Sequence, residues 1–280
     1  MGPDFGDLFS GLIVEHAVTR SVRDSAALLD ATAGPQNGDP YWAPPKERPF
    51  LQEVGANPGK LRIAFTTSSP DGNPLHPDCK KVVEQTAWLC AELGHEVTEA
   101  NLPGNDEMLV KMFLTLWSAG CAATIDGVAF ATGQRPQAEY FEPLTWALYQ
   151  QGRSHTAAEY VLALQWLQAA SRKIAQLFEV FDVLLTPTTS EPPVQLGWFD
   201  NPLTAFERAS AFVPFTPLCN MTGQPAMSVP LFQNEAGLPI GSHFIGRFGD
   251  EATLFRLAAQ LEEAAPWAGR QPLVQDKPHL

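Results

Sequence analysis

The chain alternates between two hydrophobic periods, one typical of helices and one typical of strands. The helical period predicts helices over residues 20–33, 77–93, 105–131, 156–181 and 250–265. The shorter period, together with continuous apolar runs, predicts strands over residues 61–67, 95–102, 182–186, 224–231 and 237–248. Because helices and strands interleave throughout, we predict an α/β fold with a mostly buried sheet.

Local signals support several of these elements. Ser21 is followed three residues later by Asp24, and Thr156 by Glu159, which is the spacing of helix N-terminal capping residues. The strand, helix and strand over residues 61–102 predict a parallel crossover unit.

Two segments rich in proline interrupt the pattern, at residues 35–60 and 187–202. The second is expected to be a loop. The first is either a boundary between two domains or a loop wrapped over one domain, and no other boundary is visible in the sequence.

Composition and charge exclude several classes of protein and of binding partner. The chain has 280 residues, is 45% apolar and carries a formal net charge of −13, which argues against disorder and against nucleic acid or an anionic membrane surface as partner. No stretch approaches the roughly 20 apolar residues of a membrane span. Residues 1–15 lack the basic start of a signal peptide. The four cysteines form no C-x-x-C pair, so we expect free thiols and a cytoplasmic location.

Familiar catalytic motifs are missing from the sequence. The six histidines show no metal-ligand spacing, and neither G-x-S-x-G nor a phosphate-binding glycine loop occurs. The seven lysines are interpreted as surface residues. We therefore expect no metal and no cofactor, and the residues by themselves reveal neither a nucleophile nor a base.

Three segments change this interpretation. They are VTRSVRDSAALLDATAG at 18–34, DVLLTPTT at 182–189, and FVPFTPLCNMTGQPAMSVP followed by GLPIG from residue 212 onward. In this order they resemble the amidase signature family, over nearly the whole chain. The segments GLIVEHAVTRSVRD and DPYWAPP are most similar to the branch that contains 6-aminohexanoate cyclic dimer hydrolases.

The resemblance implies a mixed central sheet covered by helices on both faces. It also implies amide hydrolysis by a Ser–cis-Ser–Lys triad, in which lysine is the base and the last serine attacks the carbonyl. The sequence has no Gly-Gly-Ser-Ser run and no S-x-G-S-[IL]-R motif. We therefore expect residues 1–280 to be the C-terminal portion of a single amidase signature domain whose N-terminal part, with the triad, is missing.

Six residues are candidates for substrate contact: Cys121, Pro187, Thr188, Phe215, Thr216 and Asn220. The resemblance implies that Cys121 is a pocket-wall residue, because cyclic dimer hydrolases carry a cysteine facing substrate in this region. The alternative is a small core residue.

The other five candidates also have ordinary structural interpretations. Pro187 and Thr188 end a buried strand, where α/β proteins often bind ligands, although an ordinary turn fits equally well. Phe215, Thr216 and Asn220 are expected in a Pro-bounded loop near the substrate funnel. Core filling by Phe215 and backbone capping by Asn220 are the alternatives.

Two hypotheses follow. In the first, the parent protein hydrolyses a small linear or cyclic amide and this chain, inactive alone, forms its scaffold and pocket wall. In the second, the chain is a non-catalytic adaptor, subunit or truncated product with the amidase scaffold. Either way, uncovered sheet edges and apolar helix faces are expected to favour self-association, so that the chain forms a homo-oligomer or is poorly soluble.

Overall fold

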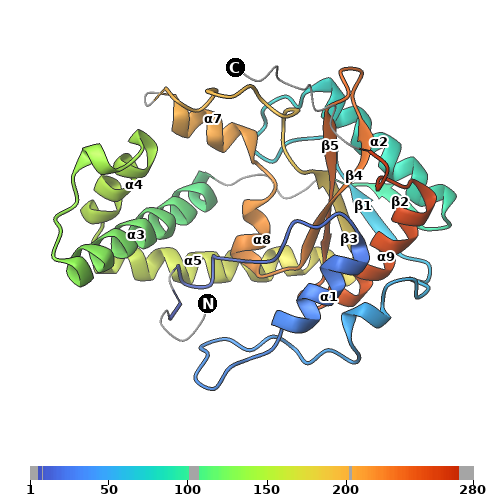
Figure 1. Cartoon of the computed structure of the whole chain (residues 1–280), viewed down its shortest axis with the longest axis horizontal. Coiled ribbons are helices and arrows are strands. Elements are labelled where there is room, and N and C mark those ends of the chain that lie inside the picture. Colours follow the sequence, from blue (N-terminus) through green and yellow to red (C-terminus); the bar gives the residue numbers. More distant parts are fainter. Residues whose placement is uncertain (1–5, 8, 101–106, 202–203, 271–280) are drawn as a thin grey trace, which may run out of the picture.

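The computed structural model describes residues 6–7, 9–100, 107–201 and 204–270. A sheet flanked by helices forms one side of the molecule, and the long helices α3, α4 and α5 extend from it (Figure 1). The strands are β1 Arg62–Phe65, β2 Glu96–Glu99, β3 Val183–Pro187, β4 Ala226–Gln233 and β5 Pro239–Gly246. The helices are α1 Val22–Thr32, α2 Pro77–Glu92, α3 Glu107–Thr132, α4 Pro143–Ser154, α5 Ala157–Ala175, α6 Leu177–Val180, α7 Ala205–Phe212, α8 Pro217–Thr222 and α9 Glu251–Ala264, with short 3₁₀ turns at Phe50–Gln52 and Ala138–Tyr140.

The described strands form one mixed sheet in the order β2-β1-β3-β5-β4. Strands β2, β1 and β3 run parallel, which confirms the predicted crossover, whereas β5 is antiparallel to both β3 and β4. Every residue of β3 is buried, as expected for the central strand of a covered sheet. The hairpin between β4 and β5 turns at Asn234, whose side chain accepts from the backbone N–H groups of Ala236 and Leu238.

Helices cover both faces of the sheet. Leucines of α9 and apolar residues of α2 pack on one face, around Ile63, Val183 and Phe244. On the other face, Phe178 of α6 and Cys219 of α8 pack against apolar residues of β1, β3 and β5. The structure therefore confirms the predicted fold class.

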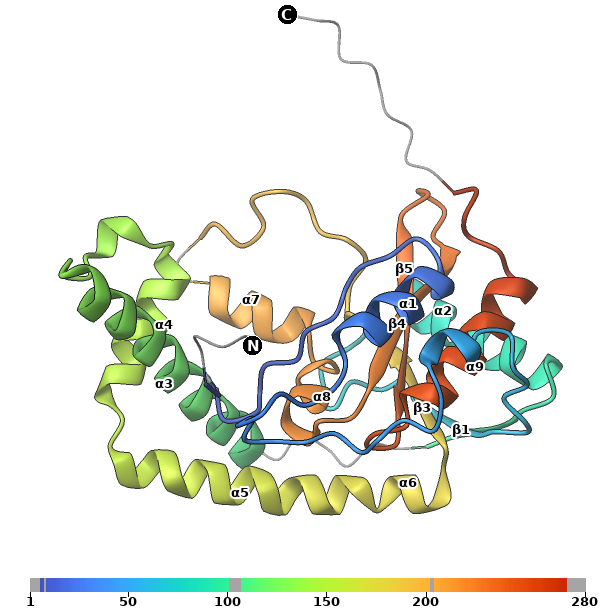
Figure 2. The same cartoon turned by 60° about the horizontal axis from the view of Figure 1, so that its bottom comes forward.

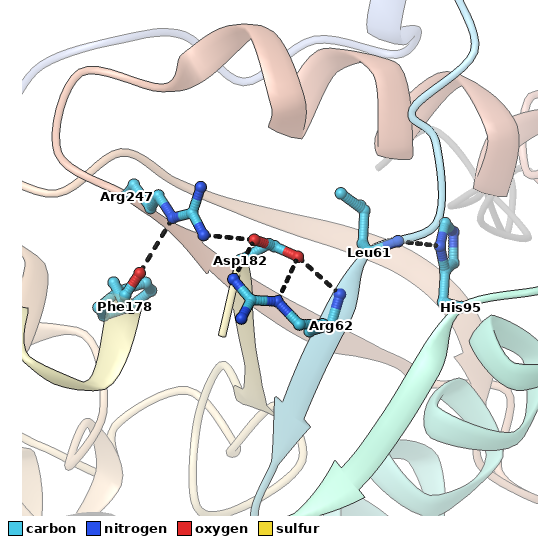
Figure 3. A network of polar contacts seen from close by, with 6 residues as sticks. All are labelled: Leu61, Arg62, His95, Phe178, Asp182 and Arg247. Atoms are coloured by element: carbon cyan, nitrogen blue, oxygen red, sulfur yellow. Dashed lines mark hydrogen bonds and ion pairs between the residues drawn. The ribbon is translucent and has the colours of Figure 1, made fainter. Parts of the chain in front are cut away.

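A charged cluster fixes the ends of three strands (Figure 3). Asp182, just before β3, accepts hydrogen bonds from the Arg62 backbone N at 2.8 Å and from Arg62 Nη2 at 3.0 Å. Arg247, just after β5, pairs with the same carboxylate and donates from Nε to the Phe178 carbonyl at 3.0 Å. Partial burial by itself raises the pKa of Asp182, but the bonds and charges of the two arginines outweigh it and lower the pKa.

The expected caps and helices are largely confirmed. Ser21 accepts from the Asp24 N–H, and Thr156 forms a full capping box with Glu159. Three helices were missed, namely α4, α7 and α8. Each has 12 residues or fewer and begins beside proline or within a proline-rich region, so its period is too short to stand out.

The proline-rich segment 35–60 lies against both α1 and α9, and its interpretation as a loop over one domain stays a prediction. Asp30 of α1 accepts from the backbone N–H groups of Phe50 and Leu51 at 2.9 and 2.8 Å. Glu53, only 1% exposed, binds Arg48 through two 2.6 Å bonds and Arg256 of α9 through one of 2.5 Å. The bonds from the two arginines hold the pKa of Glu53 at about 2.

Helix α3 passes the length and composition test for a membrane span over Met108–Thr132. The expectation that no stretch does so is therefore wrong. Core helices of soluble proteins pass the same test, and α3 packs against both α4 and α5, so this single helix is weak support for a membrane location.

Helices α3 and α4 approach closely at a glycine. A Cβ atom on Gly152 would overlap the backbone carbonyl oxygen of Ser118, whereas a Cβ atom on Gly127 of α3 would meet nothing within 4 Å. The first glycine is thus required by the helix crossing, and the second is an exposed helical position.

We expect Gly152→Ala to destabilise the protein by roughly 1–3 kcal/mol, because helix backbones must separate to admit the methyl group. The matched variant Gly127→Ala should stabilise it by roughly 0.5–1 kcal/mol, because alanine favours helix. Chemical denaturation of both variants measures the difference. Equal effects of the two changes would contradict the proposed close crossing.

Candidate functional site

A cavity of about 1260 Å³ lies between the α3–α5 helices, the segment around α7 and α8, and the sheet. Its α3 and α5 wall is mostly apolar and includes Phe113, Trp117 and Trp166, with Lys173 of α5 as a charged member. Thr186 of β3 and Ile245 of β5 line it on the sheet side. A large, mainly apolar cavity with a few polar groups is typical of a small-molecule site.

Three of the six predicted residues line this cavity. They are Phe215, Thr216 and Asn220. The expected loop is wrong for two of them, because Thr216 is the N-cap of α8 and Asn220 lies within that helix. The missed signal is Pro217, which suits the first turn of a helix.

Internal contacts hold two of these side chains in place. Phe215 is 2% exposed, so most of its ring is packed. Asn220 donates from Nδ2 to the Leu12 carbonyl at 2.8 Å, tying α8 to the N-terminal segment. Contact of either residue with substrate stays a prediction.

Thr188 lies in a second, smaller recess of about 240 Å³ at the end of β3. Its hydroxyl is 2.6 Å from that of Ser228 on β4. Gly241 borders the recess, and a Cβ atom there would overlap both hydroxyl oxygens, so glycine leaves room for the pair. Pro187 is buried in β3 and lines neither cavity.

Cys121 is half-buried between α3 and α4. Its Sγ lies 3.9 Å from the Thr145 carbonyl oxygen, and the rings of Phe141 and Trp146 belong to the same apolar cluster. Burial raises the pKa of the thiol, which disfavours a reactive thiolate. The residue is absent from the described lining of the main cavity, and its contact with substrate stays a prediction.

Sequence reasoning missed an aromatic wall opposite α3. Arg208 of α7 lies over the Trp198 ring at 4.6 Å from its centroid and donates from Nη1 to the Trp198 carbonyl at 2.7 Å. Both residues, with Phe206, line the cavity. In the sequence these residues form only a loose aromatic group in and after the proline-rich loop. Because that group has no hydrophobic period, it predicts no helix or strand.

A serine–histidine pair occurs at the α3–α4 crossing, where Ser118 Oγ is 3.0 Å from His155 Nε2. Ser118 is fully buried and its hydroxyl also lies 2.7 Å from the Leu114 carbonyl oxygen, to which it donates. The pair is therefore placed to join two helices and not to attack a substrate.

A buried polar pair lies behind the cavity. His243 of β5 is 4% exposed, and its Nδ1 is 3.0 Å from the hydroxyl of the cavity residue Thr186. Burial lowers the pKa of His243 to about 4, so the imidazole is neutral at pH 7.

The profile of the family described as Amidase matches residues 6–255 of this sequence. The chain belongs to the amidase family. This amidase chain is 31% identical over 278 residues to the 6-aminohexanoate-cyclic-dimer hydrolase of Pseudomonas sp. strain NK87, covering 95% of itself and 56% of that protein. It is 33% identical to the putative amidase AmiC of Mycobacterium leprae, covering 92% of itself and 54% of AmiC.

Solved structures agree with this placement. A 6-aminohexanoate cyclic dimer hydrolase bound to substrate superposes with a TM-score of 0.84 at 30% identity, over 90% of this chain and 55% of that one. A bacterial aryl acylamidase, at 20% identity and a TM-score of 0.70, shares the fold. The chain spans about half the length of the relatives it matches.

The buried histidine gives a pH prediction. The unfolded chain binds a proton at His243 near pH 6.5 and the folded chain only near pH 4, so stability should fall as pH drops through this window, by up to about 1.4 kcal/mol per pH unit. His243→Gln should flatten this part of the stability curve. His16→Gln, at an exposed position, is the matched control. Identical pH profiles for wild type and His243→Gln would contradict the assignment.

Proposed function

We propose that this chain forms the substrate-binding portion of an amide hydrolase that acts on a small linear or cyclic amide. One observation carries the proposal: a large apolar cavity lies in a chain whose fold matches a substrate-bound 6-aminohexanoate cyclic dimer hydrolase over 90% of its length. The same similarity supports residues 1–280 as the C-terminal portion of one amidase signature domain. Cytoplasmic location and a reaction without metal or cofactor belong to this proposal.

The cavity suits the non-reacting part of such a substrate. Aromatic and aliphatic side chains of α3 and α5 bury methylene groups, and each buried methylene contributes about 0.8 kcal/mol. The Thr216 side chain and the Asn220 amide oxygen, at the α8 side, are proposed to orient an amide, while Asn220 Nδ2 is bonded to the Leu12 carbonyl. Binding energy from such remote contacts also holds the scissile bond in position for attack.

The reacting groups are proposed to come from a complementary portion of the amidase fold. The sequence holds no Gly-Gly-Ser-Ser run and no S-x-G-S-[IL]-R motif, and the relatives extend over nearly twice this length. A lysine base, a relay serine and a nucleophilic serine from that portion would attack the carbonyl and form an acyl-enzyme, which water then hydrolyses.

We expect the chain alone not to hydrolyse linear or cyclic amides above background, and activity to arise when it is joined to the part of the Pseudomonas enzyme outside the match. Product formation on a panel of linear and cyclic amides, followed by chromatography, measures this. The control is the same assembly with its nucleophilic serine changed to alanine.

The outcomes separate the two hypotheses. Turnover by the chain alone that a serine-directed reagent abolishes would contradict the division of roles. A folded assembly that binds amides without turning them over would favour a non-catalytic scaffold.

A further inference from the structure

One arginine of the main cavity lacks a carboxylate partner. Some arginines of the chain pair with aspartate or glutamate, namely Arg48, Arg62, Arg153, Arg247 and Arg256. The others outside the cavity are exposed at the surface, namely Arg20, Arg23, Arg135, Arg172 and Arg270. Arg208 belongs to neither group. It is half-buried, it lines the cavity, and within the described ranges it forms no ion pair.

The contacts of Arg208 hold its guanidinium group in place without neutralising it. The Trp198 ring lies 4.6 Å from the guanidinium carbon, and the Trp198 carbonyl accepts from Nη1 at 2.7 Å. The ring covers one face of the flat group, and the carbonyl takes one of its five N–H donors. Because the described residues offer Arg208 no further hydrogen bond, N–H groups at the edge of the guanidinium remain for a ligand.

The surroundings of this guanidinium favour an anionic partner. The rings of Trp198 and Phe206 line the same cavity, together with the mostly apolar wall of α3 and α5. A hydrogen bond between charged groups is stronger in such surroundings than in water. A carboxylate can accept two parallel N–H bonds from the planar fork of an arginine, which a neutral amide oxygen cannot match. Arg208 is therefore suited to hold a carboxylate.

The other charged residues of the described cavity lining are all exposed. Asp71, Glu191 and Glu207 are acidic, and water screens their repulsion of a bound anion. The Asp71 carboxylate is also bonded within its own turn. Lys173 is a second cation, but it is exposed and belongs to α5, which α8 separates from α7 (Figures 1 and 2). Arg208 is thus the one half-buried charge among the described lining residues.

We infer that Arg208 binds a carboxylate at the non-reacting end of the substrate, so that the preferred substrate is a linear amide with a free carboxylate. The inference rests on the proposed function and deepens it, because it decides between the linear and the cyclic class. A cyclic amide of amino acids has no free carboxylate. It would leave the charge of Arg208 unpaired inside a mostly apolar cavity, and a site built for a polar group rejects a ligand that lacks it.

The test compares two matched probes on the full chain by titration calorimetry. One probe is 6-acetamidohexanoate, and the other is 6-acetamidohexanamide, in which a neutral amide of similar size replaces the carboxylate. The wild-type chain should bind the carboxylate probe about tenfold more tightly or better, because a hydrogen bond to a charged group is worth more than a neutral one. Tryptophan fluorescence gives an independent signal, because Trp117, Trp166 and Trp198 all line the cavity.

Variants assign the preference to one residue. Arg208→Gln should abolish the preference for the carboxylate probe, and Arg208→Lys, which keeps the charge and loses the fork, should retain part of it. Arg172→Gln is the matched control, because Arg172 is exposed on α5 and absent from the described lining. Lys173→Gln should reduce the preference less than Arg208→Gln does. Cooperative melting of each variant is checked first, and Arg208→Lys carries the comparison if Arg208→Gln fails to fold.

Equal binding of the two probes by the wild-type chain, or binding of neither, would overturn the inference. So would a preference that the Arg208 variants leave unchanged, or one that Lys173→Gln alone removes. Turnover by the chain joined to the rest of the Pseudomonas enzyme is measured separately. Turnover of neutral and cyclic amides without a carboxylate preference would leave the proposed function in place and contradict this inference. Carboxylate binding through Arg208 without any turnover by the joined assembly would do the reverse.

Discussion

The carboxylate of Asp182 fixes where three strands of the sheet meet. It lies just before β3 and binds the first residue of β1 and the residue after β5 (Figure 3). These contacts fix the register of the parallel β1–β3 pair and of the antiparallel β3–β5 pair at one end. Thr186 and Thr188, near the other end of β3, line the two cavities, so the anchor and the candidate site lie at opposite ends of a five-residue strand.

The second constraint acts on the outside of the sheet. Glu53 joins the proline-rich segment to α9, and the α1 carboxylate of Asp30 binds the same segment through two backbone N–H groups. An almost fully buried carboxylate is tolerated because two guanidinium groups satisfy both oxygens. Figure 2 shows the first part of this segment running from α1 toward the N-terminal segment, where the Tyr41 hydroxyl donates to Asp7.

Sequence patterns predicted the sheet and its long helices because apolar residues recur in those elements with a clear period. The buried run of β3, the capping box at Thr156 and the turn at Asn234 are all local signals. The short helices α7 and α8 were not predicted, because six to eight residues form only about two turns, which is too few to show a hydrophobic period. The site depends on those two helices, so the loop expected around Thr216 was wrong.

The sequence predicted only part of the site, because the residues of the site are joined by contacts between distant parts of the chain. Asn220 meets Leu12 from 208 residues away, and no spacing rule relates the two. Cys121 was identified by family likeness, yet its position against α4 depends on a helix that the sequence pattern did not reveal. The resemblance to the amidase family thus identified a segment, around Phe215 and Asn220, that lines the cavity. It did not predict the geometry of that segment.

Several polar groups around the cavity are engaged in holding the protein together. Thr186 donates to the Pro187 carbonyl and meets His243, Asn220 donates to Leu12, and Arg208 donates to Trp198. Side chains committed in this way are rigid and unreactive, which suits a wall that orients a substrate. Amide hydrolysis needs a nucleophile and a base that are free to exchange protons. The proposed function therefore assigns these groups to substrate orientation and not to bond cleavage.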